Sequence, residues 1–434
     1  MAYEYSVNAV KDDKKARTCL FSCHALATVV NLFVSTFLVA HIYSFEGGVF
    51  NYIYNVAFFN LVAYAVFFVA VALISRFVEK SNRIWFYRVG LLLRTGLVIL
   101  VLFFGKELAQ LLPVAGVLNG LSEAFYYASY NVLKQEMVSR KSMKNYAVFN
   151  QAVCKVVEIV CPVILGALIE VTTYSQVAII VLIVCIAQLA LSMGVKAQRP
   201  ADSHFSFMEY FKKLKENKTV HKKMKILYTC ALLVGGVTVP PICFNIFVML
   251  ELGSNLSLGT LTSVFSVITV IAIILVNRFT KAGRRTKLLS ILGVLPIMSS
   301  ICLLVSVNIY TILFYNLANA VSIMIYKTVY DIYRNGILKE AGFYGEICEH
   351  QAIVEMCMNA SRIVSFAAML LISLTQSLAL FNVFIIVMAL MFVAEIVLLA
   401  YYEYKYCRYD NLSEEQKSEE QFNKIMKILL TKQK

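Results

Sequence analysis

The sequence predicts an all-α membrane protein whose twelve transmembrane helices form two pseudo-symmetric six-helix bundles. Hydrophobic residues make up 60% of the 434 residues and charged residues 15%, whereas a soluble domain averages about 45–50% apolar and about 25% charged residues. Apolar runs of about 20 residues, enough for a helix to cross about 30 Å of hydrocarbon, recur along the chain. A β-barrel would show strictly alternating stretches of about 10 residues. The third observation is a polar pattern of the first half that returns in the second.

Six apolar runs fall in each half of the chain. In the first half we expect helices near residues 19–43, 50–75, 84–104, 107–133, 145–170 and 172–194. In the second half we expect them near residues 226–250, 256–277, 287–306, 309–333, 347–373 and 377–402. The first 18 residues are charged and lead into a full-length span, so the first helix is the expected insertion signal and no cleavable signal peptide is predicted. The predicted domains are residues 1–18, 19–194, 195–225, 226–404 and 405–434.

Lysine and arginine predict the orientation, because basic residues are retained on the cytoplasmic side of inserting helices. Nearly all of the 40 basic residues lie in the N-terminal segment, the tail and the connections that follow every second helix. Among the connections on the other side, we find only Lys106. We therefore expect a multi-pass plasma-membrane protein with both termini in the cytoplasm. Since this topology accounts for the net charge of +14, a nucleic-acid partner is not expected.

Two polar segments have the amphipathic pattern of helices that lie on a membrane surface. In residues 195–225 the apolar positions at helical spacing are Phe205, Phe207, Met208, Phe211 and Leu214. The tail after Ser413 repeats the pattern with Phe422, Ile425, Met426 and Leu429. The 11 cysteines include no Cys-x-x-Cys pair. We therefore expect no disulfide framework, no metal site and no cofactor.

The second half of the chain repeats polar positions of the first. The fourth predicted helix carries a series that returns 200 residues later in the tenth: Asn119, Ser122, Tyr126, Tyr130 and Asn131 match Asn319, Ser322, Tyr326, Tyr330 and Asp331. In the fifth and eleventh helices, the matching sets are Gln151, Lys155 and Glu158, and Glu355, Asn359 and Arg362. Residues three, four or seven apart share one helix face. Such duplication is how many secondary transporters are built.

Two basic turns complete the repeat. Arg76-Phe77 follows the second helix, and Arg278-Phe279 follows the eighth and leads into Arg284-Arg285. With this duplicated twelve-helix pattern, the chain resembles the major facilitator superfamily of secondary transporters over essentially its whole length. That family usually has Gly-x-x-x-Asp-Arg-x-Gly-Arg-Arg at these turns, but both copies here lack the acid before the arginine. The resemblance implies gating roles for Arg76, Arg278, Arg284 and Arg285.

Two finer resemblances lie in the fourth and fifth helices. Pro162 and Gly166 are similar to a Gly-Pro-rich motif of drug-exporting members of the superfamily, with Cys161 in place of a glycine. The region from Tyr126 to Gly166 resembles bacterial transporters of the YqgE type. The first of these resemblances favours export over import.

The family arrangement implies that helices 1, 4, 7 and 10 line a central cavity and that helices 5 and 11 flank it. Polar residues of these helices are then candidates for substrate binding: Asn31, Asn119, Tyr126, Tyr127, Tyr130, Lys155, Asn319, Tyr326, Lys327, Tyr330, Asp331, Glu355 and Arg362. An ionisable group in a span costs about 2.5–3.5 kcal/mol on insertion scales, so it usually faces protein or water. Arg94 in the third helix and Glu395 in the twelfth are expected at the periphery.

Glu123 and Glu158 are the candidates for proton coupling, because a carrier needs an acid that is protonated when occluded and ionised when water or a cation reaches it. Glu123 has no basic residue one turn away on its own helix, whereas Glu158 follows Lys155 by three residues. We therefore favour Glu123 as the proton carrier. The alternatives are that Glu123 only hydrogen-bonds Tyr or Asn across helices, and that Lys155–Glu158 and Lys327–Asp331 are internal ion pairs.

Three other features have two interpretations each. Arg362 has no acid within four residues on its helix and needs either a cross-helix partner or an anionic group of the substrate. The tyrosines form either an aromatic lining for a ring-bearing solute or ordinary packing. Gly235-Gly236 and Pro240-Pro241 are expected to interrupt the seventh helix, as a moving gate or as a static kink.

These observations predict a secondary active transporter of a small organic solute that works by alternating access, is coupled to protons and exports its substrate. Its expected partners are membrane lipid, the small-molecule substrate and protons, and a monomer is expected. The chain has no phosphate-binding Gly-x-x-x-x-Gly-Lys-Ser/Thr motif for ATP hydrolysis. It also lacks a paired nucleophile and base for membrane-embedded enzyme chemistry. A lipid flippase of the same fold and a non-transporting membrane sensor are the alternative functions.

Overall fold

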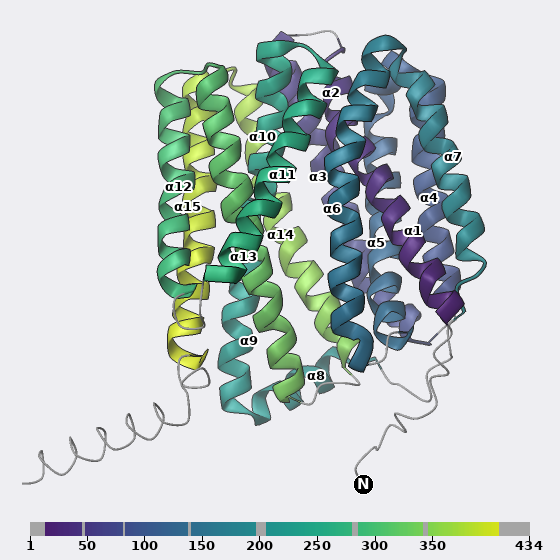
Figure 1. The fold of residues 1–434 in the computed structure, drawn as a ribbon, viewed down its shortest axis with the longest axis vertical. Coiled ribbons are helices and arrows are strands. Elements are labelled where there is room, and N and C mark those ends of the chain that lie inside the picture. The colour runs from purple at the N-terminus through teal and green to yellow at the C-terminus, as the bar shows by residue number, and fades with distance from the viewer. Residues whose placement is uncertain are drawn as a thin grey trace, which may run out of the picture.

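The computed structural model describes residues 14–45, 48–80, 83–137, 140–196, 205–279, 285–341 and 346–407. All regular structure within these ranges is helical, and the long helices run roughly parallel to one axis (Figure 1). Most of the predicted N-terminal segment and nearly all of the predicted amphipathic tail lie outside the described residues. The all-helical structure of the described residues confirms the predicted all-α fold class.

The first half of the chain contains the six predicted spans in order. Their elements are α1 (Lys14–Leu32) continued by η1 (Phe33–Leu38) and α2 (Val39–Ile42), α3 (Gly48–Lys80), α4 (Arg83–Phe104), η2 (Gly105–Leu111) leading into α5 (Leu112–Met137), α6 (Arg140–Val171) and α7 (Tyr174–Ser192).

The second half follows the same order after a short connecting helix. Its elements are α8 (Phe207–Glu216), α9 (Lys218–Ala231) with α10 (Gly235–Leu252), α11 (Asn255–Phe279), α12 (Arg285–Val305), α13 (Ile309–Ala341), α14 (Ile347–Leu374), α15 (Leu378–Tyr402) and η3 (Glu403–Cys407). Among the described residues, 11 helical segments are long and apolar enough to cross a membrane. The remaining predicted span is α12, whose described apolar part is the shorter stretch Ile291–Val305.

The seventh span is broken at its glycine pair and not at its prolines. A turn separates α9 from α10, and the Gly235 backbone N–H, at the start of α10, donates to Ser361 Oγ of α14 at 2.9 Å. A side chain at Gly235 would overlap Ser365, and one at Gly236 would overlap the α15 backbone. Pro240 and Pro241 lie inside a continuous α10. The prediction that the prolines interrupt the helix is therefore wrong, because a missing N–H bends a packed helix without necessarily ending it.

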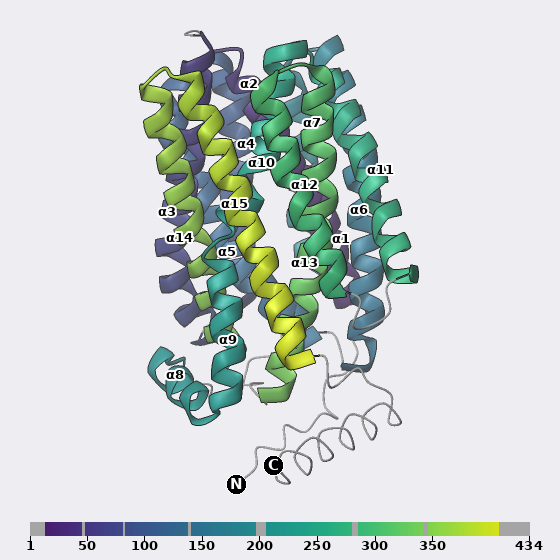
Figure 2. The same cartoon turned by 90° about the vertical axis from the view of Figure 1, so that its left-hand side faces the viewer.

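The predicted interfacial linker is shorter than expected. Only α8 is separate, since α9 already begins at Lys218, where the Asn217 side chain accepts from the backbone N–H groups of the first turn. On α8, Tyr210 and Leu214 are buried against the protein, whereas Met208 and Phe211 are exposed. The linker is thus amphipathic as predicted, with Tyr210 on the protein-facing side. We call the end of the molecule where α8 lies the linker end, and the other the α2 end (Figures 1 and 2).

The two bundles share one core at the α2 end and have mostly separate cores at the linker end. The largest hydrophobic cluster combines the α2-end halves of helices from both bundles, such as Phe37 of η1 and Phe244 of α10. At the linker end, one cluster belongs to the C-terminal half and another to the N-terminal half. A smaller cluster joins α3 and α5 to Cys348 of α14. The molecule is therefore closed at the α2 end.

Glycines allow α6 and α11 to cross closely between the bundles. A Cβ at Gly166 would collide with the Asn255 backbone carbonyl, and one at Gly259 would overlap the Pro162 carbonyl. Glu170 of α6 accepts from the Asn255 backbone N–H at 3.1 Å, at the first turn of α11. The Pro162 and Gly166 positions singled out in the sequence thus form half of an interbundle contact.

We expect Gly259→Val to destabilise the protein by about 1–3 kcal/mol, because the new side chain must displace backbone. Thermal unfolding of purified protein measures the effect. Gly96→Ala is the matched control, since Gly96 in α4 has open space around its Cβ position and alanine favours a helix. Equal melting midpoints for Gly259→Val and wild type would contradict the close crossing.

Candidate functional site

An arginine holds the N-terminal half of the site together. Arg94 of α4 is 2% exposed, and its Nη2 lies 3.3 Å from Glu123 Oε1 of α5. Its other terminal nitrogen donates to Asn31 Oδ1 of α1, and the guanidinium lies over the Tyr126 ring. The prediction that Arg94 is peripheral is therefore wrong. Sequence reasoning looked for partners of Glu123 only along its own helix, whereas this partner comes from a neighbouring one.

Stacked aromatic rings pack beside this arginine. His24 Nδ1 and the Tyr126 hydroxyl are 2.7 Å apart, and the His24 ring stacks on Tyr130 with centroids separated by 4.3 Å. Tyr126 and Tyr130 are buried within the N-terminal bundle. Tyr127 differs: it accepts a weak hydrogen bond of 3.5 Å from Asn31 Nδ2 and is half-buried at the edge of a pocket. Of these three candidate tyrosines, the structure brings Tyr127 to the space between the bundles.

The C-terminal half contributes two cations without a carboxylate partner. Arg362 of α14 donates to Thr238 Oγ1 at 3.3 Å and to Asn359 Oδ1 at 3.2 Å, and its guanidinium lies 5.0 Å from the centre of the Tyr64 ring of α3. Lys327 of α13 is exposed although it lies within an apolar span. Among the described residues, no carboxylate is within salt-bridge distance of Arg362 or Lys327.

The other candidate charges are paired locally. Lys155 and Glu158 form an ion pair on one face of α6, and Asp331 pairs with Arg334 at 3.4 Å rather than with Lys327. The internal-pair alternative for Lys155–Glu158 thus matches the observed contact, whereas the Lys327–Asp331 pair is not formed. Among the candidate cations of the described residues, Lys327 and Arg362 are left to be compensated from the cavity or by Glu355.

Electrostatic interactions connect these groups across the interface between the bundles. Lys327 interacts with Arg362 of its own half and with Lys155 and Glu158 of the other. Glu355 interacts with Arg362 and with Glu123 across the interface. Glu123, Lys155 and Glu158 remain about a quarter to a third exposed. Partly exposed charges at mid-span and the mostly separate linker-end cores indicate that the interface is less tightly packed toward the linker end than at the α2 end.

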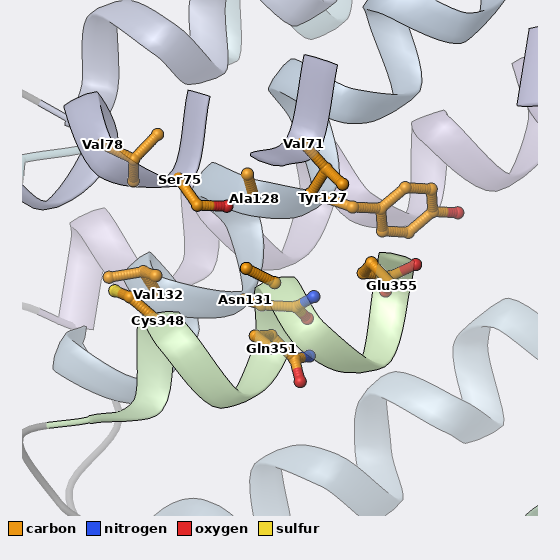
Figure 3. A pocket seen from close by; sticks show the side chains of 11 residues that line it. Val71, Ser75, Val78, Tyr127, Ala128, Asn131, Val132, Cys348, Gln351 and Glu355 are labelled. Carbon is orange, nitrogen blue, oxygen red and sulfur yellow. The ribbon is translucent and has the colours of Figure 1, made fainter. Parts of the chain in front are cut away.

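A pocket at the linker end occupies part of this interface (Figure 3). It is small, with about 10 Å³ of space, roughly enough for one water molecule, and lies between α3, α5 and α14. Its polar lining comes from Ser75, Tyr127, Asn131, Gln351 and Glu355. The Tyr127 hydroxyl and the Glu355 carboxylate lie at the same side of the pocket in Figure 3. Tyr127 also contacts Asn31, and Glu355 interacts with Arg362 and Glu123, so both residues lie between the pocket and the charged groups.

Other predicted positions are absorbed into the bundles. Asn319 donates to the Tyr315 carbonyl at 2.8 Å, and the buried Tyr330 donates to the Leu227 carbonyl at 3.3 Å. Tyr326 is buried against Phe392 of α15. Asn119 has its Oδ1 buried without a hydrogen-bond partner among the described residues. The repeated polar stripe therefore lies largely at contacts inside each bundle, because polar side chains in spans also bond to backbone carbonyls of their own helix.

The predicted gating arginines fall near the edge of the described structure. Arg76 is exposed near the end of α3. Arg284 lies outside the described residues, as do the side chains of Arg278 and Arg285. The gating roles of these four residues stay predictions.

The connecting helix α8 is fastened to the start of α14. The Ser206 backbone N–H donates to Glu349 Oε1 at 3.0 Å, and Lys213 pairs with Glu346. The hydrogen bond from Lys213 to Glu346 holds the pKa of the Lys213 ammonium above its ordinary value. Burial raises the pKa of Tyr210 to about 12, and its hydroxyl lies 3.2 Å from His350 Nδ1. Sequence reasoning missed this docking because it assigned the apolar face of the linker to lipid alone.

The described residues form twelve helical segments in two halves, 11 of them long and apolar enough to span a membrane, with partly exposed charges at mid-span. This is the architecture of a membrane transporter. The family model of the Major Facilitator Superfamily matches residues 18–336. The chain belongs to the Major Facilitator Superfamily.

Known proteins similar to this chain agree with that assignment. The uncharacterized protein YqgE of Bacillus subtilis (strain 168) is 22% identical over 323 residues, which cover 73% of this chain and 74% of YqgE. A bacterial homologue of the iron transporter ferroportin in its inward-facing state has a TM-score of 0.64 at 13% identity, covering 91% of this chain and 99% of that one. The human organic anion transporter MFSD10 has a TM-score of 0.57 at 11% identity, covering 89% and 99%. At these identities the solved structures show the shared fold.

We expect Arg94 and Glu123 to be energetically coupled. Arg94→Gln should lower the unfolding free energy by about 1–3 kcal/mol, because it leaves a partly buried carboxylate without its cation. The double variant with Glu123→Gln should lose less than the sum of the single variants. Thermal unfolding of the four proteins measures the coupling, with the exposed pair Lys213 and Glu346 as a control expected to couple by under about 1 kcal/mol. Additive effects at Arg94 and Glu123 would count against the pair.

Proposed function

We propose that this protein is a proton-coupled exporter of small organic solutes that carry an anionic group. The observation that carries the proposal is the pair of cations, Lys327 and Arg362, that face the space between the bundles without a carboxylate at salt-bridge distance among the described residues. A buried or half-buried cation needs an anion or water. A carboxylate or phosphate on the substrate supplies the anion, and Arg362 offers the planar donor fork that recognises such groups.

The rest of the solute is expected to contact aromatic and polar side chains. Tyr64 lies under the Arg362 guanidinium, and Tyr127 lines the neighbouring pocket. Aromatic faces hold apolar and ring-bearing groups while tolerating a nearby cation. Glu355 adds an acidic group on the same helix as Arg362, so a substrate with both an anionic and a cationic group is compatible with the site. Similarity in fold to an organic anion transporter supports the choice of an anion.

Glu123 is the proposed proton-coupling group. In the observed conformation it is 24% exposed and paired with Arg94, so both water and a cation reach it. Protonation removes its charge and releases the Arg94 guanidinium, which then depends on Asn31 for hydrogen bonds. This change alters the contacts among α1, α4 and α5 inside the N-terminal bundle. Glu158, which pairs with Lys155, is the second candidate and sits across the interface from Lys327.

The proposed direction rests on orientation and on the interbundle crossing. The basic connections support a cytoplasmic position of the linker end, so the less tightly packed interface there would admit a cytoplasmic substrate. Pro162 and Gly166, which resemble a motif of drug-exporting members, lie at the close α6–α11 crossing near the closed end. The proposed location is the plasma membrane.

The proposal is tested by transport into proteoliposomes with an imposed proton gradient, using matched fluorescent organic anions and cations. Wild type should accumulate the anion. Lys327→Ala and Arg362→Ala should each raise the KM for the anion about tenfold or more, since a charged hydrogen bond is worth about 1.5–3 kcal/mol. Glu123→Gln should still bind the anion but lose its dependence on the gradient.

Lys212→Ala, which changes an exposed lysine of α8, is the matched control and should transport as wild type does. Preference for the cation, or unchanged KM values in the Lys327 and Arg362 variants, would overturn the anion site. Uphill transport that persists in Glu123→Gln would remove Glu123 from the coupling. Movement of a headgroup-labelled lipid instead of the soluble anion would favour a flippase.

A further inference from the structure

The two halves of the protein contain the same contact between their first and last spans, but with one chemical difference. In the N-terminal half, Cys23 Sγ of α1 donates to the Gln188 backbone carbonyl of α7 at 3.4 Å. In the C-terminal half, Cys230 Sγ of α9 donates to the Glu395 backbone carbonyl of α15 at 3.9 Å. Both pairs are separated by 165 residues. Glu395 is therefore the structural counterpart of Gln188.

The amide at Gln188 is satisfied by this geometry. Its Nε2 donates to the Cys23 backbone carbonyl at 2.9 Å, so the contact between α1 and α7 is closed by hydrogen bonds in both directions. Gln188 is 1% exposed. A buried amide with a carbonyl acceptor is a stable arrangement in a span, because the donor has no water to turn to.

The carboxyl at Glu395 is not satisfied in the same way. The residue is fully buried at 0% exposure, and among the described residues neither side-chain oxygen makes a hydrogen bond of ordinary geometry; the polar group that the carboxyl approaches is the Tyr326 hydroxyl. An ionised carboxylate has no hydrogen to donate and can only accept. At a position with the geometry of Gln188, a carboxylate oxygen would lie against the Cys230 carbonyl oxygen with no hydrogen between them. The negative charge would also be buried away from water without compensation.

The helices around Glu395 offer little to compensate a negative charge. From α9 the neighbouring ionisable group is Cys230, and from α13 the groups are Tyr326, Lys327 and Tyr330. The α10 helix approaches α15 at Gly236, beside Met388 and Phe392. The α12 helix approaches through Gly293, which faces apolar side chains of α15. Lys327 is the one cation among the groups that interact with Glu395 in the described structure, and it is exposed on the interbundle side.

We propose that Glu395 is a proton-binding site, and that its protonated carboxyl replaces the Gln188 amide as a hydrogen-bond donor in the C-terminal half. The added hydrogen allows the carboxyl to donate to the Cys230 carbonyl or to the Tyr326 hydroxyl. The internal repeat thus carries a structural amide in one half and an ionisable group in the other. This site lies in the C-terminal bundle, apart from Glu123 and Glu158 in the N-terminal bundle.

Tyr326 gives the site a connection to the cavity. It packs on Phe392, one turn before Glu395 on α15, and interacts with the carboxyl. The next residue along α13 is Lys327, which is exposed between the bundles. Tyr326 is therefore a neighbour of the Glu395 carboxyl on the same helix as the exposed Lys327.

Infrared difference spectroscopy of the purified full-length protein tests the proposal without a substrate or a transport assay. Glu395→Gln mimics both the protonated acid and the residue found at position 188, so it should fold with a melting midpoint at or above that of wild type. The wild-type spectrum minus that of Glu395→Gln should show the carbonyl band of a protonated carboxylic acid. A difference that shows only carboxylate bands would overturn the proposal.

Gln188→Glu is the matched control for the geometry. Because it places a carboxyl at the equivalent position of the N-terminal half, it should gain a protonated-carboxyl band. Glu395→Asp gives an independent reading, since its shorter side chain should move the band in frequency. A protonated-carboxyl region that is the same in wild type, Glu395→Gln and Glu395→Asp would likewise overturn the site. Because no transport is measured, these results are independent of whether the anion or the direction proposed above is correct.

Discussion

The structure depends on how ionisable groups are compensated inside an apolar environment. A charge in a membrane span is tolerated only when it is paired, hydrogen-bonded or in contact with water. Arg94 and Glu123 satisfy this by pairing across two helices, and Lys155 and Glu158 by pairing along one. Lys327 and Arg362 satisfy it by facing the space between the bundles. We therefore propose that the unpaired charges mark where water and substrate enter.

The internal repeat supplies the frame in which these charges differ. Equivalent contacts recur in the two halves, as the Cys23–Gln188 and Cys230–Glu395 pairs show. The N-terminal half places a cation and an acid together at Arg94 and Glu123, whereas the C-terminal half leaves its cations open to the cavity. We infer that duplication produced two halves with equivalent contacts, and that substitutions at equivalent positions then gave the two halves different charged residues and different functions. In these proposals, proton exchange at Glu123 and anion binding at Lys327 and Arg362 fall on opposite sides of one interface, and Glu395 adds a proton site on the side of the anion.

Hydropathy was sufficient to predict the order of the spans, because burying backbone in lipid forces long apolar helices. It was not sufficient to predict helix ends such as Lys218, where the Asn217 cap extends the seventh span into a polar segment. The sequence was also not sufficient to predict which residues contact the charged side chains. Arg94 and Glu395 have no helical neighbour that shows their roles, since their contacts come from helices distant in sequence. The sequence does contain the equal 165-residue separation of Cys23 from Gln188 and of Cys230 from Glu395. This separation predicts equivalent positions only once the structure shows that the two residues of each pair are in contact.

The central claim is that two bundles, joined at the α2 end, rock about the charged interface. Distances between spin labels measure this directly, with one label pair at Val171 and Tyr310 near the α2 end and another at Phe77 and Tyr404 near the linker end, all exposed positions. The labels are best attached through an unnatural amino acid, since the chain has 11 cysteines. When pH or an organic anion is varied, the linker-end distance should shorten as the α2-end distance lengthens. Distances that stay fixed at both ends, or that grow and shrink together, would contradict alternating access by these two bundles.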